Sequence, residues 1–129
     1  MMRLFAFSLL FLASSVLAKN VTIDIVTDGA GCPIAVEPND PCGDGEDVCF
    51  SKGEPNRVSW KYKGSSTDAP DFQIVMKSSA DHAIFDSGCH DSAKKVSCDI
   101  ADGASAGSYA YSVVNAEGCE YDPKIIIND

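Results

Sequence analysis

The sequence predicts an all-β protein, specifically an antiparallel Greek-key β-sandwich that is cross-linked by disulfides. Three observations predict this fold class. Short segments in which apolar and polar residues alternate recur along the chain, as expected for half-buried strands. Stretches rich in Gly, Pro, Asn and Asp separate these segments and are typical of turns. The chain also contains six cysteines, an even number that is consistent with pairing in an oxidising compartment.

The first segment of the chain, residues 1–18, has the features of a secretory signal peptide. Arg3 provides a positive charge, and residues 4–12 form an apolar run that is too short to span a bilayer. Small residues then lead to Ala18, where we expect cleavage. Residues 19–129 would form a single domain that is secreted or periplasmic.

The charge of the chain limits the classes of partner that we expect. Ten basic and 19 acidic residues give a formal net charge of −9 at pH 7, and loss of the signal would make it one unit more negative. Nucleic acids and anionic membranes are polyanions, so an acidic chain without a basic cluster is a poor partner for either. We expect no nucleic-acid partner and no membrane insertion after signal cleavage.

The alternation predicts strands throughout the exported part. It is clearest around Trp60, where Val58, Trp60 and Tyr62 share one face and polar residues occupy the other. Tyr109 and Tyr111 show the same spacing. These aromatic side chains could form a ligand platform, but strand spacing favours a core, so we expect Trp60 to be buried between two sheets. The expected strands are residues 20–27, 57–62, 72–77, 83–86, 95–100, 108–115 and 124–128.

The cysteines are expected to form three disulfides rather than a redox or zinc site, because no two of them have C-x-x-C spacing. Closure of short loops favours two of the pairs and leaves the third by elimination, although other pairings suit the same sequence. The favoured pairs are Cys42 with Cys49, Cys89 with Cys98, and Cys32 with Cys119.

Three motifs resemble the cupredoxin-like, or blue-copper, β-sandwich family. They are V-x-P followed by SKGEPNRVSW (Val36 to Trp60), GSYAYSV (Gly107 to Val113) and DPKIII (Asp122 to Ile127). Members of that family carry a K-G-D-x-V-x-W strand and a G-x-Y-x-Y strand near the end of the domain. The resemblance implies a Greek-key sandwich, an architecture that immunoglobulin-like domains share.

The sequence departs from that family at the copper site. Blue-copper members have a cysteine two residues after the second tyrosine of G-x-Y-x-Y, with a histidine soon after it. Here that position is Val113, residues 114–118 contain no histidine, and His82 and His90 lie outside the motif. Type I copper needs a thiolate and two imidazoles. The resemblance therefore implies a member without the copper ligands, and we expect Cys119 in a disulfide and no cofactor.

An acidic loop at residues 40–47 is the other candidate cation site. Its carboxylates are typical of calcium loops, but Cys42 occupies a ligand position and no glutamate closes the usual spacing, which favours a solvated turn. The acidic residues of the loop are Asp40, Asp44, Glu46 and Asp47.

Both histidines adjoin an aspartate, His82 after Asp81 and His90 before Asp91. Neighbours on an extended chain point to opposite faces, so we expect surface-loop histidines and no Asp-His dyad. Asn20 begins an N-V-T sequon, which is a glycosylation acceptor if the protein comes from a eukaryote.

Two functions from different classes are consistent with these features. The first is a non-catalytic binding or structural module whose loops contact an unidentified protein or glycan. The second is an extracytoplasmic protein that binds calcium or copper weakly through residues 40–47 and the histidines. We expect no enzyme, because no nucleophile motif accompanies the histidines.

Overall fold

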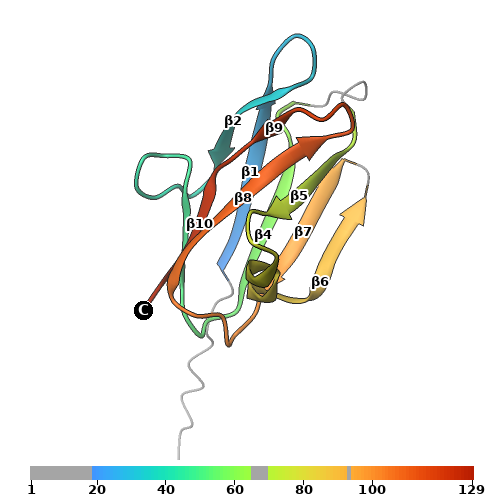
Figure 1. Ribbon diagram of the computed structural model, residues 1–129. Coiled ribbons are helices and arrows are strands. Elements are labelled where there is room, and N and C mark those ends of the chain that lie inside the picture. Colours follow the sequence, from blue (N-terminus) through green and yellow to red (C-terminus); the bar gives the residue numbers. More distant parts are fainter. Residues whose placement is uncertain (1–18, 65–69, 93) are drawn as a thin grey trace, which may run out of the picture.

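The protein is a β-sandwich of two sheets that pack face to face (Figure 1). The structure is a computed structural model and describes residues 19–64, 70–92 and 94–129. The expected signal peptide, residues 1–18, lies outside the described residues. The strands are β1 (Lys19–Thr27), β2 (Pro33–Pro38), β3 (Val48–Ser51), β4 (Asn56–Tyr62), β5 (Phe72–Met76), β6 (Phe85–Ser92), β7 (Lys95–Ile100), β8 (Gly107–Asn115), β9 (Glu120–Tyr121) and β10 (Lys124–Asn128).

The first sheet has the order β2-β1-β4-β7-β6, and the second has the order β3-β10-β8-β5 with β9 paired to β8. The predicted all-β sandwich is confirmed. The pairing is mixed, however, rather than antiparallel throughout, because β1 runs parallel to β4 and β3 runs parallel to β10. Between β1 and β4 the chain crosses to the second sheet for β3 and then returns. This crossover lets β4 enter the first sheet in the same direction as β1.

Five of the expected strands coincide with β1, β4, β5, β8 and β10 within a residue at each end, and β7 matches without a shift. The strand expected at residues 83–86 is wrong in its position. A 3-10 helix, η1 (Ser79–Ile84), occupies its first half, and β6 then runs from Phe85 to Ser92. A register shift between Phe85 and Cys89 interrupts β6, so its sequence shows no clean alternation.

Three strands, β2, β3 and β9, were not expected from the sequence. The segment PIAVEP of β2 has a proline at each end, and β3, which contains Cys49, lies in a turn-rich region. Proline disfavours a central strand but is tolerated at an edge, and both β2 and β3 lie at sheet edges. β9 has only two residues, too few to show a period.

Trp60 lies at the centre of the core, as predicted, with an exposed fraction of 0%. It extends from β4 in the first sheet to Tyr111 on β8 in the second. The Trp60 indole Nε1 donates a hydrogen bond of 3.0 Å to the Tyr111 hydroxyl, and the two rings meet edge to face. Tyr62 is also buried, and it packs against Phe72 across the sandwich. These aromatic residues therefore form the core, not a ligand platform.

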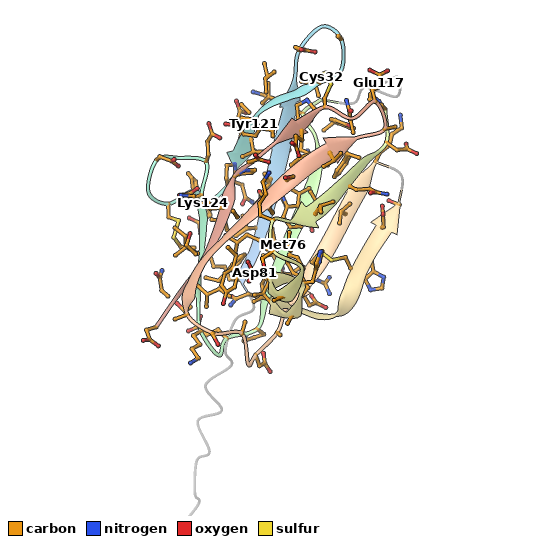
Figure 2. The ribbon with its side chains drawn as sticks, viewed as in Figure 1. Cys32, Met76, Asp81, Glu117, Tyr121 and Lys124 are labelled. Carbon is orange, nitrogen blue, oxygen red and sulfur yellow. A yellow bond between two sulfur atoms is a disulfide. The ribbon has the colours of Figure 1, made fainter. Side chains whose placement is uncertain are left out.

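All six cysteines are paired, and the pairs are those that the loop-closure argument favours. Two disulfides span short loops, whereas Cys32–Cys119 joins residues 87 apart in the sequence. Figure 2 places Cys32 and Glu117 at the same end of the sandwich.

Among the described residues, no helix has the length and apolarity needed to cross a membrane.

Candidate functional site

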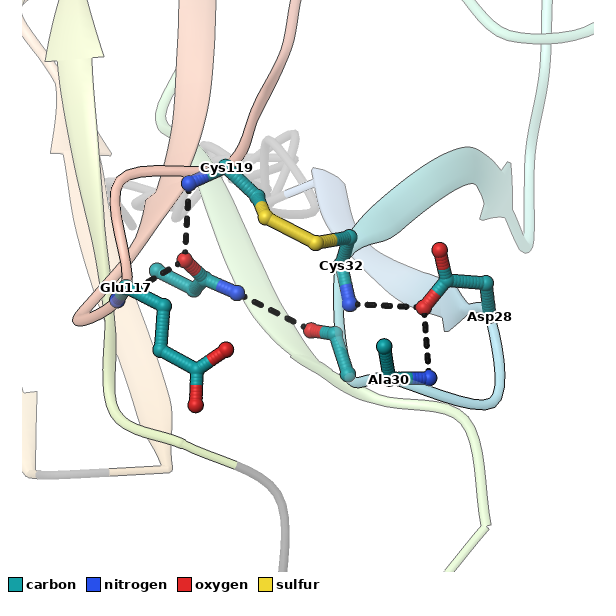
Figure 3. The surroundings of a disulfide bond; sticks show 7 residues. Asp28, Ala30, Cys32, Glu117 and Cys119 are labelled. Carbon is teal, nitrogen blue, oxygen red and sulfur yellow. Dashed lines mark hydrogen bonds between the residues drawn. A yellow bond between two sulfur atoms is a disulfide. The ribbon is translucent and has the colours of Figure 1, made fainter.

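The end of the sandwich where the resemblance would place copper is occupied by the Cys32–Cys119 disulfide (Figure 3). Val113, where the resemblance would place a thiolate ligand, is fully buried in β8. Two residues later, Asn115 is only 4% exposed. Its Oδ1 accepts hydrogen bonds from the backbone N–H groups of Glu117 and Cys119, at 3.0 and 2.9 Å. Residues 115–119 therefore form a closed turn.

The loop at residues 28–32, on the other side of the disulfide, is also stabilised by a side chain that accepts backbone hydrogen bonds. The Asp28 carboxylate accepts the backbone N–H groups of Ala30 and Cys32, at 2.8 and 3.0 Å. The amide Nδ2 of Asn115 then donates to the carbonyl of Gly31 at 3.0 Å and links the two loops. Gly31 has φ +84°, a left-handed conformation that glycine adopts without strain. The disulfide and these hydrogen bonds together join the two loops.

The two histidines are not brought to this end. His82 lies in η1 and His90 lies in β6, so the expectation that both occupy surface loops is wrong, although both side chains are exposed. Local 3-10 hydrogen bonds form the segment around His82, and pairing of β6 with β7 forms the segment around His90. The sequence around each histidine is too polar to predict the 3-10 helix or the strand. Within the described ranges, no group of three or more His, Cys, Asp or Glu side chains could hold a metal ion.

The acidic loop at residues 40–47 uses several of its carboxylates in contacts within the protein. The Lys19 Nζ forms an ion pair with Asp40 at 3.2 Å. The Tyr121 hydroxyl donates a hydrogen bond to Glu46, and this bond, together with desolvation, raises the pKa of Tyr121 to about 12. Burial, followed by the nearby charge of Asp44, raises the pKa of Asp47. The loop therefore carries a concentrated negative charge.

A polar cleft lies at the opposite end of the first sheet, where β1 and β4 begin and β7 ends. Its volume is about 480 Å³. Antiparallel pairing of β4 with β7 places Arg57 beside Asp99, and the Arg57 Nε donates a hydrogen bond to Asp99 Oδ1 at 2.8 Å. This bond lowers the pKa of Asp99. The cleft is lined by Asn20, Pro55, Asn56, Arg57, Asp99, Ile100 and Asp102.

Asn56 lines the cleft and has one buried atom without a hydrogen-bond partner among the described residues. The residue is 5% exposed, and its Nδ2 donates to the carbonyl of Ser51 at 3.1 Å. Its Oδ1 is buried and accepts no hydrogen bond from the described part of the chain. Buried polar atoms nearly always have a partner, so this oxygen is an exception within the fold, and its burial keeps it out of contact with a ligand in the cleft.

Sequence reasoning did not identify this cleft, because Arg57 and Asp99 are 42 residues apart and only the strand register brings them together. No family model and no curated protein matches this chain.

Proposed function

We propose that this protein is a non-catalytic binding module, secreted or periplasmic, which holds a protein or glycan partner at the cleft around Arg57. The main support for this proposal is the cleft itself, with the polar side chains that line it. Three disulfides in a small domain support an extracytoplasmic location, because such bonds persist in oxidising compartments.

The groups in the cleft suit a partner rich in hydroxyl or amide groups. The Arg57 guanidinium provides several donors, the Asp99 carboxylate provides acceptors, and the Asn20 amide provides both. Arg57 and Asp99 are each about half exposed, so their ion pair contributes little and can reorganise around a ligand.

We further propose that the domain is a Greek-key member of the cupredoxin-like sandwiches that has no copper site. The strand that carries the G-x-Y-x-Y motif is β8, which lies between β10 and β5 in the second sheet, and the tryptophan strand is β4, in the middle of the first sheet. The hydrogen bond from Trp60 to Tyr111 joins these two motifs across the core. This arrangement supports the proposal, since both motifs serve the packing between sheets.

Replacing Arg57 by alanine should lower affinity for the partner about tenfold or more, because a hydrogen bond from a charged donor is lost. The binding is measured with immobilised protein on a glycan array and against the native extracellular fraction. Lys61→Ala is the matched control. Lys61 also lies on β4 and pairs with Asp24 at 2.8 Å, but it does not line the cleft. Partner binding that survives Arg57→Ala would place the site elsewhere, and failure to capture any partner would contradict a binding module.

The alternative function is weak cation binding at residues 40–47, where Asp40, Asp44, Glu46 and Asp47 lie in one loop, although no three of the described metal-ligating side chains are grouped to hold an ion. We expect copper(II) to give no intense blue thiolate band, since all six cysteine sulfurs are in disulfides. Calorimetry with calcium tests the alternative directly. A heat of calcium binding that is present in the unchanged protein and absent in Asp47→Asn would favour the cation-binding function over partner binding at the cleft.

A further inference from the structure

The second sheet ends at β5, which pairs only with β8 in the described part of the chain. Proteins protect such free edges against association by proline, bulges, charges or shortness. Three of the four sheet edges here have such protection. β2 has a proline at each end, β3 has four residues, and β6 contains a register shift with exposed His90 and Asp91. β5, with the sequence FQIVM, has none of these features.

The backbone of β5 presents hydrogen-bonding groups at this edge. The ladder to β8 continues beyond both ends of the strand, since the N–H of Lys77 donates to Ala110 at 3.0 Å and the carbonyl of Asp71 accepts from Ala116 at 2.9 Å. In an antiparallel ladder, alternate residues direct both backbone groups to the same side. The residues whose N–H and C=O groups face away from β8 are therefore Phe72, Ile74 and Met76.

The segment from Asp71 to Lys77, DFQIVMK, is complementary to itself when a second copy runs antiparallel to it. With a two-fold axis at Ile74, Asp71 of each copy lies opposite Lys77 of the other. These charged side chains are exposed and lie on the same outer face of the sheet, so each would meet an opposite charge. The remaining opposed pairs in this register are Phe72 with Met76, Gln73 with Val75, and Ile74 with itself.

We propose that two copies of this chain associate through β5 and extend the second sheets into one continuous sheet. The two-fold axis makes the interface isologous, so that a single self-complementary strand is sufficient. The register pairs the outward backbone groups of Phe72 with those of Met76 and the groups of Ile74 with their own copies. It also places Val75, one of the two exposed large apolar side chains among the described residues, beside Gln73 of the other copy.

The charge of the chain favours this edge as the meeting point. The whole protein carries a net charge of −9, so two copies repel each other over most of their surface. The segment 71–77 contains one acid and one base and is neutral. Lys77 also contacts Asp122 at 2.9 Å, and its three N–H donors allow it to keep this contact while it binds Asp71 of the other copy.

Sedimentation velocity of the disulfide-intact protein should show a reversible monomer–dimer equilibrium whose dimer fraction rises with concentration. A carbodiimide, which joins a carboxylate to an amine without a spacer, should link Asp71 to Lys77 in the dimer. Six residue steps along the strand put these side chains about 20 Å apart within one chain, so this cross-link forms only between copies. A monomer at all concentrations, or a dimer without this cross-link, would overturn the proposal.

Charge reversal tests the register. Lys77→Asp and Asp71→Lys should each raise the dimer Kd about tenfold, because each places two like-charged pairs across the axis. The double variant Asp71→Lys with Lys77→Asp restores opposite charges and should return Kd to within about threefold of the starting value. The Lys77 contact with Asp122 is lost in both Lys77→Asp and the double variant, so its loss cannot explain the recovery.

Lys63→Asp is the matched control, because it makes the same charge change and breaks a surface pair with Glu37 at 2.7 Å, away from β5. Its dimer Kd should equal that of the unchanged protein. Equal Kd values for all the variants, or a double variant that stays as weak as the singles, would contradict the β5 interface.

Discussion

Replacing Trp60 by alanine should lower the free energy of unfolding by about 3 to 5 kcal/mol, the largest effect expected of any single side chain. Trp60 is fully buried and contacts aromatic rings from both sheets, Tyr111 at 5.3 Å and Phe85 at 6.4 Å between ring centroids. The substitution opens a cavity between the sheets and removes the hydrogen-bond partner of the Tyr111 hydroxyl. Urea unfolding followed by circular dichroism measures the loss.

Tyr111→Phe separates the hydrogen bond from the packing. It keeps the ring and removes only the acceptor of the Trp60 N–H, so it should cost about 1 to 3 kcal/mol. In the unchanged protein, Trp60 fluorescence should be blue-shifted and protected from soluble quenchers. An alanine variant with unchanged stability, or a freely quenched Trp60, would show that this side chain is not the link between the sheets.

Removing the Cys32–Cys119 disulfide, by changing both cysteines to alanine, should destabilise the protein by about 4 to 5 kcal/mol. The bond joins residues 87 apart in sequence, and a cross-link that closes a long loop removes more entropy from the unfolded chain than one that closes a short loop. It also holds the turn at Asn115 against the loop at Gly31. The melting temperature and urea midpoint of the variant measure this effect.

The matched control is the removal of Cys42–Cys49, whose separation of seven residues predicts a smaller loss of about 2 to 3 kcal/mol. Equal losses from the two double variants would contradict loop entropy as the main cause. Mass spectrometry after alkylation without reduction should find no modified cysteine in the unchanged protein, and modification at Cys32 or Cys119 would contradict this pairing.

Several parts of the structure could be predicted because they depend on local pattern. Alternation in RVSWKY places Val58, Trp60 and Tyr62 on the buried face of β4, and all three are in the core. Burial on one face requires a period of two, so the alternation directly reports which side chains are inside. The disulfide pairs followed from short loop closure at Cys42 and Cys89, which is also a local property.

The sequence by itself determined the all-β class, the buried face of each strongly alternating strand and the short-loop disulfides, because nearest neighbours along the chain control these features. Only the tertiary structure decided the parallel pairing of β1 with β4, the cleft and the free edge at β5. Alternation specifies which face of a strand is buried, but it carries no information about which strand lies alongside or in which direction. The contact between Arg57 and Asp99 therefore depends on the register between β4 and β7. Packing of the whole sandwich determines that register.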